Sequence, residues 1–203
     1  MSQNEQNASG ASRRERIGIL GGTFDPVHVG HLMDASAARY QLALDRVLVV
    51  VARDPWQKRD RVIAPAETRY EMLVAALDGC VGIDASRIEL ERDGPTYTVD
   101  TVDQLASADR ELFLVIGSDV AAGLPTWHRV DDLRQRVTLA IVDRETSPFP
   151  DPDGWRVARV AVPRLELSST DLRARVAAGE PIEFLVPTPA ARILRAHHLY
   201  EGP

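Results

Sequence analysis

Hydrophobic and polar positions divide the chain into short unbroken apolar runs and longer stretches with apolar residues at helical spacing. The first apolar run covers residues 17–20 and is followed by Val29–Gln41, where apolar residues recur every three or four positions. Arg46–Val51 is a second apolar run, of the kind that is covered on both faces of a parallel sheet. These segments predict a strand, a helix and a strand, which together form one βαβ unit.

The same two patterns continue to the end of the chain. A helix is expected from Pro65 to the Asp78-Gly79 stop, with an apolar stripe of Tyr70, Leu73, Val74 and Leu77. Further strands are expected at 81–83, 87–90, 112–116, 137–142 and 156–162, and further helices at 99–105, 120–123, 130–134, 170–177 and 189–197. This alternation predicts a single Rossmann-like α/β domain with a parallel sheet of five or six strands and ligands at their carboxyl ends.

Length and composition indicate one domain that binds small molecules. The 203 residues suffice for one α/β core, and a net charge of −6 provides no basic field for nucleic acid. Cys80 is the only cysteine, which excludes an internal disulfide and a cysteine-based zinc site and suits a reducing cytoplasm. No apolar stretch is long enough to cross a bilayer. Residues 1–15 are polar and small and predict a disordered tail before a domain at 16–203.

The most informative stretch runs from Gly21 to His31 and reads GGTFDPVHVGH. Its glycine pair is expected to turn the backbone sharply and to let a ligand approach without a Cβ in the way. The helix that starts near Val29 directs its N-terminal amides at this turn, where they attract an anion. His28 and His31 are three positions apart, which places both imidazoles on one face, and Gly30 between them leaves room for a nucleotide. Each feature alone is common.

The complete string resembles the signature of the nucleotidyltransferase superfamily, and its first six residues resemble most closely the bacterial nicotinate-nucleotide adenylyltransferases. The resemblance implies transfer of an adenylyl group from ATP to nicotinate mononucleotide, which gives deamido-NAD and pyrophosphate in NAD biosynthesis. It also implies Mg²⁺, which would be bound mainly through the ATP phosphates, so no metal ligands are expected from the protein. A homo-oligomer is left open.

A second segment of the resemblance covers residues 167–173 and reads LSSTDLR. On its own residues, Ser168 with Asp171 three positions later predicts a capping box for the helix that follows, which is a common feature. The segment resembles the family's Ile-Ser-Ser-Thr-x-Ile-Arg element, which holds the ATP phosphates. The resemblance therefore implies that Arg173 supplies a planar, permanently charged fork for the leaving diphosphate.

A third segment covers residues 94–101 and reads GPTYTVDT. On local sequence, a capped helix start explains it as well as a ligand site does. It resembles the family's nicotinate-site string Gly-x-Ser-Tyr-Thr-x-Asp-Thr, so Thr96, Tyr97 and Thr98 are implied donors to the pyridine carboxylate. Trp127, expected to expose its indole in a polar loop, is implied to stack on the pyridine ring.

Two further strand ends carry candidate residues. Lys58 follows the second strand and is expected at the carboxyl edge of the sheet, where the family carries a lysine in a Pro-rich loop. Gly117 and Asp119 follow the strand at 112–116 and resemble the family's Gly-x-Asp segment near the nucleotide, although Asp119 is equally suited to cap a short helix. After the next strand, Glu and Thr follow Arg144 where the family has Arg-Pro-Gly.

The implied site therefore has three overlapping parts. The catalytic residues are His28, His31, Lys58 and Arg173. The ATP site comprises Gly21, Gly22, Thr23, Phe24, His28, His31, Gly117, Asp119, Ser168, Ser169, Thr170 and Arg173. The nicotinate mononucleotide site comprises Thr23, Lys58, Thr96, Tyr97, Thr98, Asp119 and Trp127. Because the acceptor phosphate is itself an anionic nucleophile, the chemistry needs donors and cations rather than an activated Ser or Cys.

Three alternatives stay open. A related transferase for nicotinamide mononucleotide or phosphopantetheine would share the early and late motifs. A fragment of a class I aminoacyl-tRNA synthetase would share His-x-Gly-His, but the acidic charge balance opposes it. A catalytically silent nucleotide-binding regulator is opposed by the intact His28, His31, Lys58 and Arg173. The preference for acid or amide is not decided by the residues, because no Lys or Arg is clearly directed at a pyridine carboxylate.

Overall fold

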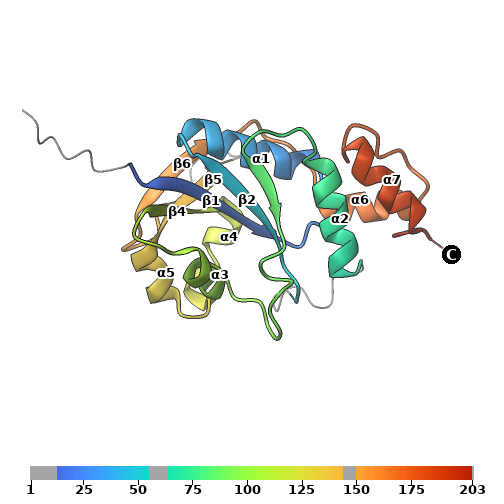
Figure 1. Cartoon of the computed structure of the whole chain (residues 1–203). Helices are drawn as coiled ribbons and strands as arrows, with labels where there is room; N and C mark the ends of the chain where they lie inside the picture. Colours follow the sequence, from blue (N-terminus) through green and yellow to red (C-terminus); the bar gives the residue numbers. More distant parts are fainter. Residues whose placement is uncertain (1–12, 55–63, 144–149, 203) are drawn as a thin grey trace, which may run out of the picture.

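The computed structural model describes residues 13–54, 64–143 and 150–202, which form a six-stranded parallel sheet in the order β3-β2-β1-β4-β5-β6 (Figure 1). The strands are β1 (Glu15–Gly22), β2 (Arg46–Val51), β3 (Ile83–Ser86), β4 (Arg110–Gly117), β5 (Val137–Asp143) and β6 (Val157–Ala161). The expected Rossmann-like α/β fold is confirmed. The tail expected at 1–15 lies largely outside the described residues, and Glu15 already belongs to β1.

Helices cover both faces of the sheet (Figure 1). They are α1 (Val29–Gln41), α2 (Ala66–Ala76), α3 (Thr98–Leu105), α4 (Ser118–Ala121), α5 (Val130–Arg136), α6 (Ser169–Ala177) and α7 (Thr188–Ala196), with the 3₁₀ helix η2 (Leu124–Thr126). Alternate residues of β4 pack into two different cores, Phe113 with α1, α2, α6 and α7, and Leu114 with α3, α4 and α5. Burial on both faces explains why the strands appear in the sequence as unbroken apolar runs. No helix in the described parts of the chain is long and apolar enough to span a membrane.

The order of the strands defines where a ligand is expected to bind. β1 lies between β2 and β4, and the helices that follow β1 and β4 pack on opposite faces of the sheet. In open α/β sheets, ligands bind at the carboxyl ends of two such strands. Gly22 ends β1 and Gly117 ends β4, so the early glycine pair and the Gly-x-Asp segment meet at this point.

The third strand differs from its expected position. Strands were expected at 81–83 and 87–90, but β3 covers Ile83–Ser86 and residues 87–90 form a turn. β3 is an edge strand that pairs with β2 alone, and its four residues are all half-buried. An edge strand of this kind has no continuous apolar run, so the hydrophobic pattern did not mark it.

The buried face of α2 also differs from the expected stripe. Val74 is 45% exposed, whereas Arg69, Met72 and Leu73 are buried. An arginine can occupy the buried face because its guanidinium donates to backbone carbonyl groups, as described below. The expected stripe is confirmed at Leu73 and Leu77 and was wrong at Val74, because the charged Arg69 shares the face that meets the core.

Candidate functional site

The glycine pair at the end of β1 does not turn the chain. Gly21 and Gly22 pair with Val50 and Val51 of β2, and neither glycine has a positive φ. The sharp turn expected at the pair is therefore wrong, and the chain reverses after it, where Phe24 has a φ of 50°. A Cβ on Gly22 would lie 2.8 Å from the Phe24 ring, whereas no atom lies within 4 Å of a Cβ on Gly21. Gly22 makes room for Phe24, and Gly21 leaves the space that a ligand needs.

The two histidines of the early motif stack on each other at the start of α1. Their ring centroids are 3.6 Å apart, with an angle of 23° between the ring planes, so the expectation of a shared face is confirmed. The backbone N–H of His28 donates to Nδ1 of His31 over 3.2 Å. Because Nδ1 accepts this hydrogen bond, the neutral His31 ring carries its proton on Nε2. His31 thus has a donor nitrogen, which a group that binds phosphate requires.

The start of α1 is less open than its sequence indicates. A Cβ on Gly30 would lie 3.0 Å from Nδ1 of His28, so the space expected for a nucleotide over Gly30 is occupied by this imidazole. His28 is only 4% exposed. The first amide of the helix, that of Val29, donates to the carbonyl of Leu185 over 2.9 Å. The N-terminal amides of α1 are therefore only partly available to an anion.

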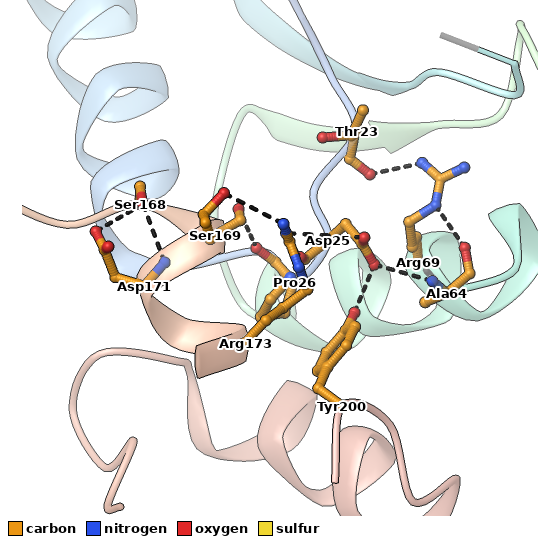
Figure 2. Close-up of polar contacts among 11 residues, drawn as sticks. Thr23, Asp25, Pro26, Ala64, Arg69, Ser168, Ser169, Asp171, Arg173 and Tyr200 are labelled. Atoms are coloured by element: carbon orange, nitrogen blue, oxygen red, sulfur yellow. Dashed lines mark hydrogen bonds and ion pairs between the residues drawn. The ribbon is translucent and has the colours of Figure 1, made fainter. Parts of the chain in front are cut away.

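Helix α6 brings the late motif onto the backbone of the early motif (Figure 2). Oγ of Ser169 donates to the carbonyl of Pro26 over 3.0 Å, and Nη1 of Arg173 donates to the carbonyl of Asp25 over 2.9 Å. Asp25 and Pro26 lie in the turn that leads directly to His28. The histidine pair and the arginine thus flank one short piece of backbone.

The hydroxyl groups of the late motif hold the start of α6 in place. Ser168 is the N-cap residue, and its Oγ accepts the N–H of Asp171 over 3.1 Å, which confirms the expected cap. Nη2 of Arg173 donates to Oγ1 of Thr170 over 3.2 Å. The Ser168, Ser169 and Thr170 hydroxyls and the Arg173 fork all bond within the protein, and Arg173 is the one cation of residues 167–173.

Asp25 lies at the centre of this junction with a buried carboxylate (Figure 2). Its Oδ1 accepts hydrogen bonds from the Tyr200 hydroxyl over 2.6 Å and from the Ala64 N–H over 3.2 Å. Its Oδ2 lies 3.9 Å from Nη1 of Arg173. Burial and the hydrogen bond to Asp25 raise the pKa of Tyr200 above its ordinary value, so the hydroxyl stays protonated and donates. Asp25 had no separate role among the residues implied by the motif.

Arg69 on α2 is a further residue of this site that the motifs did not indicate. Its Nη1 donates to the carbonyl of Thr23 over 2.6 Å, Nη2 to that of Ala52 over 2.9 Å, and Nε to that of Ala64 over 3.1 Å. Burial lowers the pKa of the Arg69 guanidinium, and the nearby Asp25 carboxylate opposes that shift. The one signal available in the sequence was a charged residue within an otherwise apolar helix face.

The helix after β4 begins two residues earlier than expected. The helix expected at 120–123 is α4 (Ser118–Ala121), so Asp119 lies in its first turn and Gly117 is the N-cap residue. A Cβ on Gly117 would collide with Oδ1 of Asp119, which means that the carboxylate folds back over the end of the strand. Asp119 is exposed there, beside the end of β1.

Thr96, one of the residues expected for the acceptor, lies beside the carboxyl end of β2. Oγ1 of Thr96 accepts the N–H of Asp54 over 3.1 Å. The N–H of Ala52, two residues earlier, donates to the carbonyl of Gly22 over 2.9 Å. The acceptor segment is thereby connected through β2 to the early motif at the end of β1.

Two aromatic residues of the expected acceptor site pack against the same core. Tyr97, the N-cap residue of α3, and Trp127, which follows η2, both contact the core beneath α3, α4 and α5. The Trp127 indole, expected to be exposed, is half-buried. The ring of His128, which had no expected role, lies 4.3 Å from the Tyr97 ring. Tyr97 and His128 are therefore in ring contact, and Trp127 packs against the same core as Tyr97.

Two residues considered in the sequence lie outside the described residues. They are Lys58, implied as a catalytic cation, and Arg144, which follows β5. Within the described ranges, no group of three or more His, Cys, Asp or Glu side chains could hold a metal ion.

A family model described as cytidylyltransferase-like matches residues 19–175. The matched region begins in β1 and ends in α6, so it includes the early and the late motifs. It also includes the third segment and Trp127, which lie between them.

Bacterial relatives match almost the whole chain. A protein of Streptomyces coelicolor is 43% identical over 188 residues, covering 90% of this chain and 100% of the relative. One of Saccharopolyspora erythraea is 40% identical over 196 residues, covering 94% and 92%. Both carry the name "Probable nicotinate-nucleotide adenylyltransferase".

Solved structures of the nicotinic acid mononucleotide adenylyltransferase of Plasmodium falciparum share the fold. One is complexed with APC and one with NaAD, and both have a TM-score of 0.72. Each comparison covers 92% of this chain and 97% of the solved chain, at 17% and 18% sequence identity. At this identity the comparison bears on the arrangement of strands and helices alone.

Proposed function

Since the chain belongs to the cytidylyltransferase-like family, and within it to the nicotinate-nucleotide adenylyltransferases, we propose that it joins ATP and nicotinate mononucleotide where β1, α1 and α6 meet. The products are deamido-NAD and pyrophosphate, and the reaction belongs to NAD biosynthesis. The substrates are small molecules, in keeping with the acidic net charge of −6.

The reaction requires alignment of two phosphates more than it requires a reactive side chain. A phosphate oxygen of nicotinate mononucleotide attacks the α-phosphorus of ATP and forms a new P–O bond. The bond between that phosphorus and the oxygen bridging to the β-phosphate breaks, and the electron pair leaves with pyrophosphate. Because the nucleophile is already an anion, the protein has to hold both phosphates in line and neutralise the charge that develops.

The contact of α6 with the turn before α1 is the observation that carries this proposal. Arg173 donates to the backbone of Asp25, three residues before His28, so cationic and imidazole donors flank the same turn. The Arg173 fork would bind the leaving diphosphate, and Nε2 of His31 would donate to the phosphate that is transferred. Lys58 stays in the proposal as a further cation on sequence grounds.

The two nucleotides have separate places along the sheet edge in this proposal. ATP would lie over the ends of β1 and β4, against Gly21, Gly22, Thr23, Phe24, Gly117 and Asp119. Nicotinate mononucleotide would lie towards β2, against Thr96, Tyr97, Thr98 and Trp127. The hydrogen bonds from Asp54 to Thr96 and from Ala52 to Gly22 support this assignment, because they connect the two places.

Mg²⁺ is expected to enter the site bound to the phosphates of ATP. Among the residues that the structure describes, Asp25 is committed to Tyr200 and Ala64, and no carboxylate cluster surrounds the turn. The ion would therefore be held by phosphate oxygens and water rather than by protein side chains. When bound, it neutralises charge on the phosphates and so assists departure of the diphosphate.

The single cysteine bears on the cellular compartment. Cys80 is exposed, and the sequence contains no second cysteine for an internal disulfide. A reducing cytoplasm suits such a thiol, and it is the proposed location of the protein.

A homo-oligomer is also compatible with the proposed function, and analytical ultracentrifugation would determine the oligomeric state.

An acceptor screen tests the proposed function. The full chain is incubated with ATP, Mg²⁺ and one of three acceptors, namely nicotinate mononucleotide, nicotinamide mononucleotide or phosphopantetheine. We expect equal amounts of deamido-NAD and pyrophosphate, with the acid preferred over the amide. Preference for another acceptor would contradict the proposed substrate, and ATP binding without any product would identify a regulator instead.

A further inference from the structure

Three buried residues, Asp25, Arg69 and Tyr200, lie next to the turn that the proposal assigns to the phosphates, and we call them the buried clamp (Figure 2). Tyr200 bonds directly to Asp25, and Arg69 is linked to Asp25 through the Ala64 backbone, whose carbonyl accepts from Arg69 and whose N–H donates to Asp25. The three residues come from the turn before α1, from α2 and from the segment after α7. The proposed function gives none of them a contact with a substrate. Their polar atoms contact protein groups that lie next to the residues assigned to the phosphates.

Arg69 connects three separate pieces of backbone through one rigid group. Its three nitrogens donate to the carbonyls of Thr23, Ala52 and Ala64, which follow β1, follow β2 and precede α2. A guanidinium holds its N–H groups in a fixed planar fork, whereas a lysine ammonium is a compact point charge that cannot reach the same three carbonyls. Arg69 therefore ties the segments that follow β1 and β2 to each other and to the start of α2.

Asp25 connects Arg69 and Tyr200 to the residues assigned to the phosphates. Its carboxylate faces the other two residues of the clamp. It accepts hydrogen bonds from the Tyr200 hydroxyl and the Ala64 N–H, and it attracts the positive charge of Arg69. Its backbone carbonyl faces α6 and accepts from Arg173 over 2.9 Å. One residue thus joins the buried groups to the cation assigned to the leaving diphosphate.

Tyr200 ties the C-terminal segment to the same point. The residue is buried and has a φ of 62°. Residues other than glycine adopt this backbone conformation only when surrounding contacts hold them in it. Its hydroxyl donates to Asp25 across 175 positions of sequence. This hydrogen bond between distant parts of the chain constrains the side chain of Asp25, and through it the turn that leads to His28.

We infer that Arg69 and Tyr200 are positioning residues for adenylyl transfer, which act through Asp25 to orient Arg173 and the turn that carries the histidine pair. The inference rests on the proposed function. A shift of one ångström or less in a group that aligns phosphates is enough to slow an in-line transfer, so removal of a hydrogen bond in the clamp should lower turnover in a folded protein.

The first test uses Tyr200→Phe, which removes one oxygen and keeps the ring. We expect kcat/KM for ATP to fall about 10-fold, and the KM for nicotinate mononucleotide to change less than 2-fold. Arg69→Lys is expected to lower kcat about 100-fold, with a native circular dichroism spectrum. Ile17→Val, at the opposite end of β1, is the control. It should lower the melting temperature and leave kcat and both KM values unchanged.

A second measurement separates positioning from general destabilisation. If Tyr200 acts through Arg173, the Tyr200→Phe substitution should cost little further activity in a protein that already carries Arg173→Lys. Equal fold-losses in both backgrounds, or a lower melting temperature with unchanged kcat and KM, would overturn the inference. If the unmodified chain makes no deamido-NAD, the proposed function itself fails, which is a distinguishable result.

Discussion

The guanidinium of Arg173 donates a hydrogen bond to the backbone carbonyl of Asp25, 2.9 Å away and 148 positions earlier in the chain. Ser169 makes a parallel contact with the carbonyl of Pro26. These two bonds join the late motif to the early motif at the carboxyl edge of the sheet. The proposed chemistry depends on this junction, because one triphosphate must reach both the histidine pair and the arginine.

Arg173→Lys should lower kcat/KM for ATP by about 10- to 100-fold. The lysine keeps the charge, but it cannot hold the Asp25 carbonyl and a diphosphate with a planar fork. Arg175→Lys is a matched control on the same helix, since Arg175 is exposed and pairs with Glu180 over 3.4 Å. Steady-state kinetics with ATP varied would measure both, and equal effects of the two substitutions would contradict the role of Arg173.

His31→Ala should lower turnover at least about 100-fold, as expected when a donor to a transition state is removed. His31→Gln should retain more activity, because its amide can accept the His28 N–H and still donate. His198→Ala, at an exposed residue beside Glu201, serves as the control. Near-native turnover of His31→Ala would show that the imidazole does not contact the transferred phosphate.

Trp127→Ala should weaken nicotinate mononucleotide more than ATP. Aromatic stacking contributes about 0.5–1.5 kcal/mol, which corresponds to a rise of about 2- to 12-fold in the KM of the acceptor. Trp155→Ala is the control, because Trp155 is also half-buried against the same core but has no proposed ligand. Equal changes in the KM values of both substrates would remove Trp127 from the acceptor site.

Glu89 provides a prediction on stability. Its carboxylate is 8% exposed, accepts the Thr101 hydroxyl over 2.7 Å and lies 3.8 Å from Arg92. Burial raises the pKa of Glu89 above its ordinary value of 4.5, and the contacts with Thr101 and Arg92 offset this only in part. The folded state therefore binds the Glu89 proton more tightly than the unfolded state, and the associated stability is lost as pH rises.

Glu89→Gln cannot ionise, so it should remove this dependence. The free energy of unfolding of Glu89→Gln, relative to the unmodified protein, should increase as pH rises from about 4.5 and level off above the raised pKa. Glu91→Gln, at an exposed residue paired with Arg87, is the matched control for the substitution itself. Urea unfolding between about pH 4 and pH 8 measures both. A flat or falling difference for Glu89→Gln would contradict the direction of the shift.

Much of the fold followed from local patterns, and the exceptions have identifiable causes. Arg46–Val51 is buried on both faces, and its unbroken apolar run predicted a strand with the observed bounds. β3 was misplaced because an edge strand containing Asp84 and Ser86 has no such run. The glycine pair was expected to turn the chain, but glycine only permits a positive φ, and Phe24 adopts it instead.

The site was predictable only where its residues form a motif. The string from Gly21 to His31 identified the histidine pair, and the serine-rich segment identified the cap at Ser168. Arg69 and Tyr200 were not predicted as residues of the site, because Arg69 binds backbone carbonyls and Tyr200 binds a carboxylate 175 positions away. Backbone acceptors exist at every residue, so such contacts leave no pattern in a single sequence.

A crystal structure of the chain with a non-hydrolysable ATP analogue tests the central claim most directly. The account predicts that one triphosphate lies within hydrogen-bond distance of both the His31 imidazole and the Arg173 guanidinium, with the adenosine over the ends of β1 and β4. A triphosphate that contacts only one of these two residues, or that binds away from the junction of α1 and α6, would contradict it.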